Sequence, residues 1–277
     1  ANGGIVSERF GLREFGVDAA SSRLTLNGEV LKLVGWNHHT QWPDTGASPT
    51  DEQMDTDITM LKAGGTNYVR GAHYPQDPRW LDRLDEAGIV MWSETLGPSV
   101  SVHNIQDPEW MEVQLTQLGE MLDNAMNHAS IMTWGWFNEG PSDKAEACPG
   151  YAACTSLVRS RDPTRFTTWA SNKDLDDKCL EHASLISFNN YPKWYNGADP
   201  TEQWNKFANG VRAGTSSSGN HTPGKPFVIS ETGAGGIYEW NDNATDDKWT
   251  LKFQTEIISQ DVDVAIANGN ISGITLW

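Results

Sequence analysis

The segment Ile131-Met-Thr-Trp-Gly-Trp-Phe-Asn-Glu139 is an apolar run that ends in two polar residues. The segment Pro226-Phe-Val-Ile-Ser-Glu231 repeats this pattern later in the chain. A short apolar run bounded by turn or helix signals is typical of a buried strand in a parallel sheet. Both runs therefore predict strands that carry a glutamate at the carboxyl end.

Strand-like runs of this kind alternate with helical patterns eight times along the 277 residues. The predicted strands cover residues 31–37, 67–70, 89–94, 131–139, 165–170, 185–189, 226–231 and 271–277. Four predicted helices cover residues 77–87, 107–127, 202–211 and 246–267. One more starts near residue 48, and another ends near residue 161. A single barrel typically has roughly 250 residues, so this alternation predicts an α/β fold, a (β/α)₈ TIM barrel, over an open doubly wound sheet. The chain lacks Gly-x-Gly-x-x-Gly after the first strand and any Walker-type loop, which excludes dinucleotide and P-loop functions.

The predicted barrel begins at residue 31 and ends on its eighth strand at Trp277, without an eighth helix. Residues 1–30 form an N-terminal extension, in which the segment 24–28 predicts a hairpin with an Asn-Gly turn that caps the barrel bottom. Residues 214–220 are rich in Ser and Gly and predict a surface loop.

The formal net charge of −17 excludes nucleic acid and anionic membranes as partners. The chain has no apolar run of about 18 residues, the length that predicts a membrane span. Residues 1–4 lack the basic and apolar parts of a signal peptide, so we expect the chain to begin after a processing site or inside a longer protein. Thirteen tryptophans favour both a large aromatic core and flat surfaces that stack on sugar rings.

The three cysteines, Cys148, Cys154 and Cys179, form no Cys-x-x-Cys motif, so a zinc site is not expected. Cys148 and Cys154 flank a Pro-Gly-Tyr segment and are close enough in sequence to form a disulfide. Glycosylation sequons begin at Asn220, Asn243 and Asn270. They favour a secreted or extracytoplasmic location.

In such barrels the active site lies at the carboxyl ends of the strands. The reactive or aromatic residues at or just after the predicted strand ends are His38, His39, His73, Glu94, Asn138, Glu139, Tyr191, Glu231 and Trp277. A retaining glycosidase needs one carboxyl group that protonates the leaving oxygen and another that attacks the anomeric carbon. One buried glutamate is equally well explained by a salt bridge inside the barrel. The pair Glu139 and Glu231, at the fourth and seventh strand ends, instead predicts two catalytic carboxylates.

The chain resembles the catalytic domain of glycoside hydrolase family 2, which contains β-galactosidases and β-glucuronidases. The resemblance extends over nearly the whole chain. Its motifs are Gly35-Trp-Asn-His-His39, Asn67-Tyr-Val-Arg-Gly-Ala-His-Tyr-Pro75, Leu81-Asp-Arg-Leu-Asp-Glu-Ala-Gly-Ile89, Ile131–Glu139 and Phe227-Val-Ile-Ser-Glu-Thr-Gly233.

The resemblance implies a role for individual residues. Glu139 is the implied acid/base and Glu231 the implied nucleophile, while Asn138 binds the sugar 2-hydroxyl. Arg70 supports the nucleophile, although an ion pair inside the barrel explains it almost as well. The residues implied to contact the substrate besides Asn138 are His39, His73, Tyr191, Trp194, Trp277 and Glu94.

The chain departs from the family pattern in ways that affect substrate and cofactor. Family members usually carry β-sandwich domains before the barrel, so flanking domains of a longer parent are implied. The segment Glu94–Ser99 contains no histidine, so the magnesium site of large β-galactosidases is not expected; we predict no metal and no cofactor. Glucuronidases bind the sugar carboxylate with an Asn-x-Lys element beyond the eighth strand, where this chain has ended.

The predicted function is therefore a retaining exo-β-glycosidase with a carbohydrate substrate, β-galactosidase being narrowly favoured. The alternatives are a β-glucuronidase, an endo-β-glucanase or mannanase of the same clan, and a carbohydrate-binding pseudoenzyme. A metal-dependent hydrolase is disfavoured because the strand ends lack His-x-His pairs.

Overall fold

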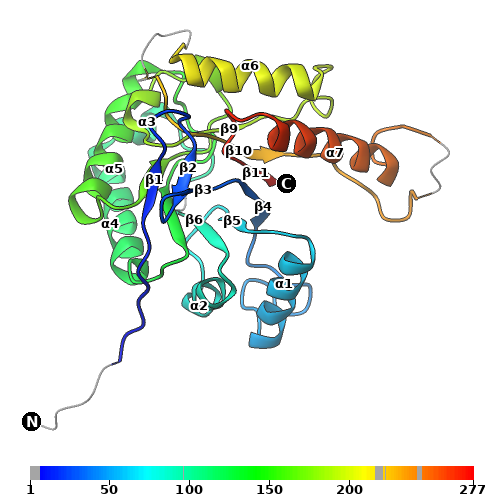
Figure 1. Cartoon of the computed structure of the whole chain (residues 1–277). Coiled ribbons are helices and arrows are strands. Elements are labelled where there is room, and N and C mark those ends of the chain that lie inside the picture. Colours follow the sequence, from blue (N-terminus) through cyan, green and yellow to red (C-terminus); the bar gives the residue numbers. More distant parts are fainter. Residues whose placement is uncertain (1–6, 96, 216–220, 222, 242–244) are drawn as a thin grey trace, which may run out of the picture.

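Eight parallel strands form one sheet in the computed structural model of this chain (Figure 1). The structure describes residues 7–95, 97–215, 221, 223–241 and 245–277. The sequons at Asn220 and Asn243 and most of the predicted loop 214–220 lie outside these residues. The strands are β4 (Leu33–His38), β5 (Tyr68–Gly71), β6 (Val90–Glu94), β7 (Ile131–Gly135), β8 (Phe166–Thr168), β9 (Ile186–Asn189), β10 (Phe227–Thr232) and β11 (Gly273–Leu276).

The sheet runs in the order β8-β7-β6-β5-β4-β11-β10-β9 and closes on itself between its two edge strands. Ser171, just after β8, forms a parallel bridge with Phe188 of β9. The backbone N–H of Asn189 donates to the carbonyl of Ser171 at 2.9 Å. The predicted TIM barrel is thereby confirmed.

Two apolar layers hold the barrel together. The inner one fills the barrel bottom and includes Leu33, Tyr68 and Trp92, whereas the outer one packs the strands against the helices. Gly35 is required where β4 passes β5, because a Cβ at this position would lie 1.5 Å from the carbonyl oxygen of Tyr68.

The N-terminal extension forms a small antiparallel sheet of β1 (Phe15–Val17), β2 (Leu24–Leu26) and β3 (Glu29–Val30). Asn27 and Gly28 form the predicted turn, with φ of 51° and 83°. These positive values suit the turn type that favours Asn-Gly in two-residue hairpins. Leu24 is buried against the inner layer, so this sheet caps the barrel bottom as the sequence predicted.

Most of the α-helices begin after a residue whose side chain caps the first turn, whereas one begins after Ala147 without such a cap. They are α1 (Asp51–Ala63), α2 (Pro78–Ala87), α3 (Val102–Gln106), α4 (Pro108–Ala125), α5 (Cys148–Arg161), α6 (Pro200–Ala213) and α7 (Leu251–Ala267). Three of them start with an aspartate cap followed by proline, at Asp77, Asp107 and Asp199. Proline suits the first helical position because its missing N–H would have no partner there. Within the described ranges, no helix combines the length and apolar character needed to cross a membrane.

The predicted alternation of strands and helices fails at one connection, where no α-helix follows the strand. Between β8 and β9 the chain forms only two short 3₁₀ helices, Asp174–Asp176 and Leu180–His182. This segment is cross-linked through Cys179, and its backbone is held around the buried Asp177 in place of a regular helix.

The Cys148–Cys154 disulfide, which the sequence left open, is absent from the structure. Cys148 pairs with Cys179 at a Cα–Cα distance of 5.0 Å, and Cys154 is free and buried. Cys148 and Cys154 both lie in α5, where six residues rise about 9 Å, beyond the roughly 4.4–6.8 Å that a disulfide spans. Burial raises the pKa of the Cys154 thiol, so this cysteine is unreactive at neutral pH.

We expect the paired change of Cys148→Ser and Cys179→Ser to lower the free energy of unfolding by about 2–4 kcal/mol. The disulfide closes a loop with a sequence separation of 31 residues, which restricts the unfolded chain. Urea unfolding without reductant measures the difference. An unchanged midpoint would show that the disulfide does not constrain the unfolded state.

Candidate active site

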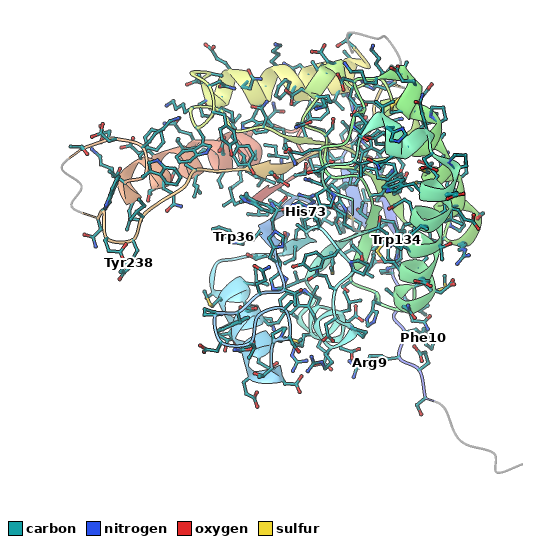
Figure 2. All side chains as sticks on the ribbon, turned by 180° about the vertical axis from the view of Figure 1, so that it is seen from behind. Arg9, Phe10, Trp36, His73, Trp134 and Tyr238 are labelled. Carbon is teal, nitrogen blue, oxygen red and sulfur yellow. A yellow bond between two sulfur atoms is a disulfide. The ribbon has the colours of Figure 1, made fainter. Side chains whose placement is uncertain are left out.

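The predicted site residues converge on the mouth of the barrel at the carboxyl ends of its strands. His39 follows β4, Arg70 lies in β5 and His73 follows it, and Glu94 ends β6. Asn138 and Glu139 follow β7, Tyr191 follows β9, Glu231 lies in β10 and Trp277 follows β11. Figure 2 shows His73 near the centre of the molecule and Trp134 on the side of the green helices.

Glu139 reaches the mouth because the backbone changes direction after β7. Phe137 and Glu139 have φ of 54° and 53°, a region that non-glycine residues seldom adopt. The N–H of Glu139 donates to the carbonyl of Ala170 at 2.8 Å and anchors this bend to the segment that follows β8. Trp134, Trp136 and Phe137 are buried in the outer layer rather than beside the Glu139 carboxylate.

Glu231 lies on the opposite part of the mouth and is held by two donors. Arg70 Nη1 donates to its Oε1 at 2.6 Å, and the Tyr191 hydroxyl donates to its Oε2 at 2.8 Å. Only 5% of Glu231 is exposed. Hydrogen bonds to a carboxylate stabilise its charged form, which is the form that acts as a nucleophile.

Arg70 is the centre of a buried network. It donates to both oxygens of Glu94 at 3.0 Å, to Oδ1 of Asn138 at 2.8 Å and to Oδ1 of Asn37 at 3.0 Å. Burial alone would lower the pKa of Arg70, but the charges of Glu94 and Glu231 outweigh it and raise that pKa. The predicted support of Glu231 and the alternative ion pair inside the barrel are therefore both present.

Glu94 is placed differently from the substrate contact that the resemblance implied. Its side chain is fully buried, and its oxygens accept from Arg70 and contact Nδ1 of His73 at 3.0 Å. A carboxylate beneath the guanidinium, away from solvent, cannot touch a sugar in this arrangement. Its position instead suits a partner that orients Arg70.

Tyr191 is a neutral donor to the candidate nucleophile. Burial, reinforced by the charge of Glu231, raises the pKa of Tyr191 above its usual value near 10. The hydroxyl therefore remains protonated, and keeps donating to Glu231, through neutral and moderately alkaline pH.

We expect Tyr191→Phe to lower kcat about 10- to 100-fold, because a hydrogen bond to a charged group contributes about 1.5–3 kcal/mol. The alkaline limb of the pH–rate profile should keep its position, since Tyr191 does not titrate there. Steady-state kinetics from about pH 5 to about pH 9 test both statements, because the limbs of the profile report the pKa values of the catalytic groups. A limb that moves in the variant would contradict the assignment of Tyr191 as a permanent donor.

Aromatic rings line the side of the mouth formed by β4, β5 and β11. Trp277 stacks on His73 with ring centroids 5.3 Å apart, and His39 meets both rings edge-on. Burial and the neighbouring His73 lower the pKa of His39, which favours the neutral ring at neutral pH. Trp277 is 44% exposed and offers a free face of the kind that stacks on a sugar.

Trp194, which the resemblance implied to contact the substrate, packs among other aromatic residues. Its ring packs edge-on against Trp249 at 4.8 Å and near Tyr195 at 6.3 Å. Tyr195 in turn contacts Tyr191 at 5.2 Å. Trp194 therefore reaches the candidate carboxylates only through intervening tyrosines.

The sequence analysis missed several asparagines and a tyrosine of the site. Asn189 Nδ2 donates to Glu139 Oε1 at 3.1 Å and to Asn138 Oδ1 at 3.2 Å, and Asn172 Nδ2 donates to Glu139 Oε2 at 3.0 Å. Asn37 contacts Arg70, and the Tyr74 hydroxyl contacts His39 Nδ1 at 3.1 Å. Asn37 and Tyr74 lie inside quoted motifs and Asn189 ends a predicted strand, which was the available signal. Asn172 lies in no quoted motif, so no comparable signal identified it.

One group of side chains away from this site has ligand atoms close enough together to hold a metal ion. Among the described residues, Asp82, Asp85 and His128 lie close enough to share an ion. They sit near the amino ends of the strands, and Asp85 already accepts from His128 at 2.8 Å and from the N–H of Ser130 at 2.7 Å. This set therefore has no role in the chemistry at the mouth.

A cavity of about 680 Å³ lies between α2 and α4, outside the barrel wall. Ser93 and Thr95 line it, while Glu94 between them points into the barrel. It holds no pair of carboxylates, so the candidate active site is the mouth rather than this cavity.

Comparison with known proteins identifies one family and several similar enzymes. The family described as glycosyl hydrolases family 2, TIM barrel domain, matches residues 17–268. A β-glucuronidase of Bacteroides fragilis is 30% identical over 200 residues, covering 71% of this chain and 28% of that protein. A β-galactosidase of Vibrio vulnificus is 30% identical over 208 residues, covering 71% of this chain and 19% of that protein.

Among solved structures, a GH2 β-galacturonidase of Eisenbergiella tayi bound to galacturonate superimposes with a TM-score of 0.90. It is 30% identical, and the match covers 98% of this chain and 47% of that protein. The chain thus spans less than half the length of each of these relatives.

Proposed function

Since this chain belongs to glycosyl hydrolase family 2, we propose that it hydrolyses terminal β-linked sugars with retention of configuration. One observation carries this proposal: a continuous set of hydrogen bonds joins the two candidate carboxylates across the mouth. Glu231 is bound by Arg70, Arg70 by Asn138, and Asn138 by Asn189, which also binds Glu139. The network holds two carboxyl groups, the pair that double displacement requires, at two strand ends of the mouth.

In the first step, an oxygen of Glu231 attacks the anomeric carbon while Glu139 gives its proton to the glycosidic oxygen. The bond to the leaving group breaks and a glycosyl ester forms on Glu231. In the second step, Glu139 takes a proton from water, and the water oxygen displaces Glu231 from the sugar. Both steps invert the anomeric carbon, so the product retains the configuration of the substrate.

Asn138 is placed to bind the sugar. Its Oδ1 accepts from Arg70 at 2.8 Å and from Asn189 at 3.2 Å, which fixes the orientation of the amide. In the described part of the chain its Nδ2 has no acceptor. This free donor suits the 2-hydroxyl of a sugar bound over Glu231, a contact that strengthens in the transition state.

The sugar is proposed to have the galacto configuration. Galactose and galacturonic acid share this configuration, and they are the sugars named for the Vibrio enzyme and the Eisenbergiella enzyme. The rings of His39, His73 and Trp277 close one side of the mouth, which supports action on chain ends over action within a polymer. Glucuronic acid, named for the Bacteroides relative, is the second candidate.

We also propose an extracytoplasmic location and a longer parent with flanking domains. The Cys148–Cys179 disulfide supports the location, because such bonds persist in oxidising compartments. The greater length of the relatives supports the flanking domains.

The test is hydrolysis of p-nitrophenyl β-galactoside, β-galacturonide, β-glucuronide, β-glucoside and β-mannoside by the chain, with β-glucan and mannan alongside. Proton NMR of the first-formed product reports its anomer. Release of a β-anomer from either galacto-configured substrate supports the proposal. Cleavage of the polymers alone would indicate an endo-acting enzyme, and sugar binding without any cleavage would indicate a pseudoenzyme.

A further inference from the structure

Two loops lie together on the Glu139 side of the mouth. We call residues 137–148, which follow β7, the acid loop, and residues 169–183, which follow β8, the clamp loop. The N–H of Lys178 donates to the carbonyl of Ser142 at 2.7 Å, and the Cys148–Cys179 disulfide joins the two loops covalently. The acid loop carries Glu139, and the clamp loop carries Asn172.

Buried Asp177 fixes the clamp loop against the acid loop. Its Oδ2 accepts from Ser142 of the acid loop at 2.5 Å and from Ser171 at 2.7 Å. It also accepts from Trp169 Nε1 at 2.9 Å, and its Oδ1 accepts from the N–H of Cys179 at 2.8 Å. Burial raises the pKa of Asp177, while these hydrogen bonds favour its charged form. Four of them around one buried carboxylate hold residues 169–179 in a single arrangement.

The two oxygens of Glu139 face different surroundings. Oε1 accepts from Asn189, a buried residue whose own Oδ1 accepts from Ser230 at 2.7 Å. Oε2 accepts from Asn172, which is exposed. Oε2 is therefore the oxygen on the solvent side, where a leaving group must depart while the sugar stays above Glu231.

We propose that Asn172 is a positioning residue for proton transfer to the leaving group, and that the disulfide and Asp177 hold it in place. This inference rests on the proposed glycosidase function. Without the Asn172 amide, the solvent-side oxygen of Glu139 is free to turn away from the glycosidic oxygen. The inner contact with Asn189 remains, so the carboxyl group stays in the mouth but loses its alignment.

Loss of alignment has a distinctive kinetic result. A strongly basic leaving group, such as methoxide, needs a proton as the glycosidic bond breaks, whereas 2,4-dinitrophenolate departs without one. General acid catalysis contributes about 10²–10⁴-fold, so we expect Asn172→Ala to lower kcat/KM about 10- to 100-fold on the methyl glycoside. On the 2,4-dinitrophenyl glycoside of the same sugar, where this contribution is absent, we expect less than about a threefold change.

The experiment compares both glycosides across a matched set of variants. Asn172→Leu keeps a side chain of similar size but has no donor, and should behave like Asn172→Ala. The double variant Cys148→Ser/Cys179→Ser should show the same selective loss on the methyl glycoside, after circular dichroism has shown that it is folded. Asn127→Ala, at the other end of the barrel, and Cys154→Ala, at the free cysteine, are the controls and should leave the ratio of the two activities unchanged.

Each outcome supports or overturns the inference. Selective loss on the methyl glycoside in the Asn172 variants and in the double cysteine variant supports it. Equal loss on both glycosides, or no loss on either, overturns it, since Asn172 would then have a structural role or none. A wild-type chain that cleaves neither glycoside overturns the proposed function itself. Selective loss in the Asn172 variants but not in the cysteine variant overturns the role of the disulfide.

Discussion

Glu231→Ala is expected to lower kcat by about 10⁴- to 10⁶-fold, the range found when a covalent nucleophile is removed. The reason is geometric. Arg70 and Tyr191 hold the carboxylate in place, and neither of them can replace it as the group that bonds to the anomeric carbon. The fold should survive, because Glu231 lies at the mouth and Arg70 keeps Glu94 as its second carboxylate partner.

The measurement is steady-state hydrolysis of the 2,4-dinitrophenyl glycoside, with Glu139→Ala as the matched variant. Added azide should rescue the two variants differently. In Glu231→Ala it takes the place of the nucleophile and gives the α-glycosyl azide, whereas in Glu139→Ala it attacks the glycosyl ester and gives the β-glycosyl azide. Reversed products would exchange the two assigned roles. An active Glu231→Ala variant without azide would refute the double-displacement mechanism.

Arg70→Met is expected to lower the free energy of unfolding by about 3–5 kcal/mol, the loss found when one partner of a buried ion pair is removed. Arg70 and Glu94 are both fully buried, and the guanidinium donates one hydrogen bond to each oxygen of Glu94. Without Arg70, Glu94 would lose this cationic partner. Activity should also be lost, because Glu231 and Asn138 lose the donor that orients them.

A second variant separates stability from activity at this position. Arg70→Met combined with Glu94→Leu removes both members of the buried pair, so it should recover much of the stability but none of the activity. Urea unfolding and hydrolysis of the 2,4-dinitrophenyl glycoside measure the two effects. If the double variant is no more stable than Arg70→Met, the uncompensated charge of Glu94 is not the source of the loss.

The fold was largely predictable because its signals are local. Each barrel strand is a short apolar run, and Asp77, Asp107 and Asp199 mark three helix starts by capping the chain ahead of a proline. The Asn27-Gly28 turn likewise depends on the two residues that form it. The exception is the connection between β8 and β9, where a disulfide and a buried aspartate replace the expected regular alternation.

The site was predictable in its outline but not in its contacts. Glu139 and Glu231 were found because a strand end is a local property and barrel strands point the same way. The burial of Glu94 beneath Arg70 was not visible, since it depends on how β5 and β6 pack side by side. The packing of Trp194 against Trp249 was likewise not visible in the sequence, because the two residues are far apart along the chain.

The sequence by itself determined the order of strands and helices, the turn that caps the barrel bottom and the two glutamates at the mouth. These features follow from periodicity, capping and strand direction, which act over a few residues. Only the tertiary structure decided that Cys148 pairs with Cys179, that Arg70 joins Glu94 to Glu231, and that Asn172 and Asn189 share Glu139. Each of these contacts joins residues brought together by closure of the barrel, and its distance and direction are set by packing that no local pattern records.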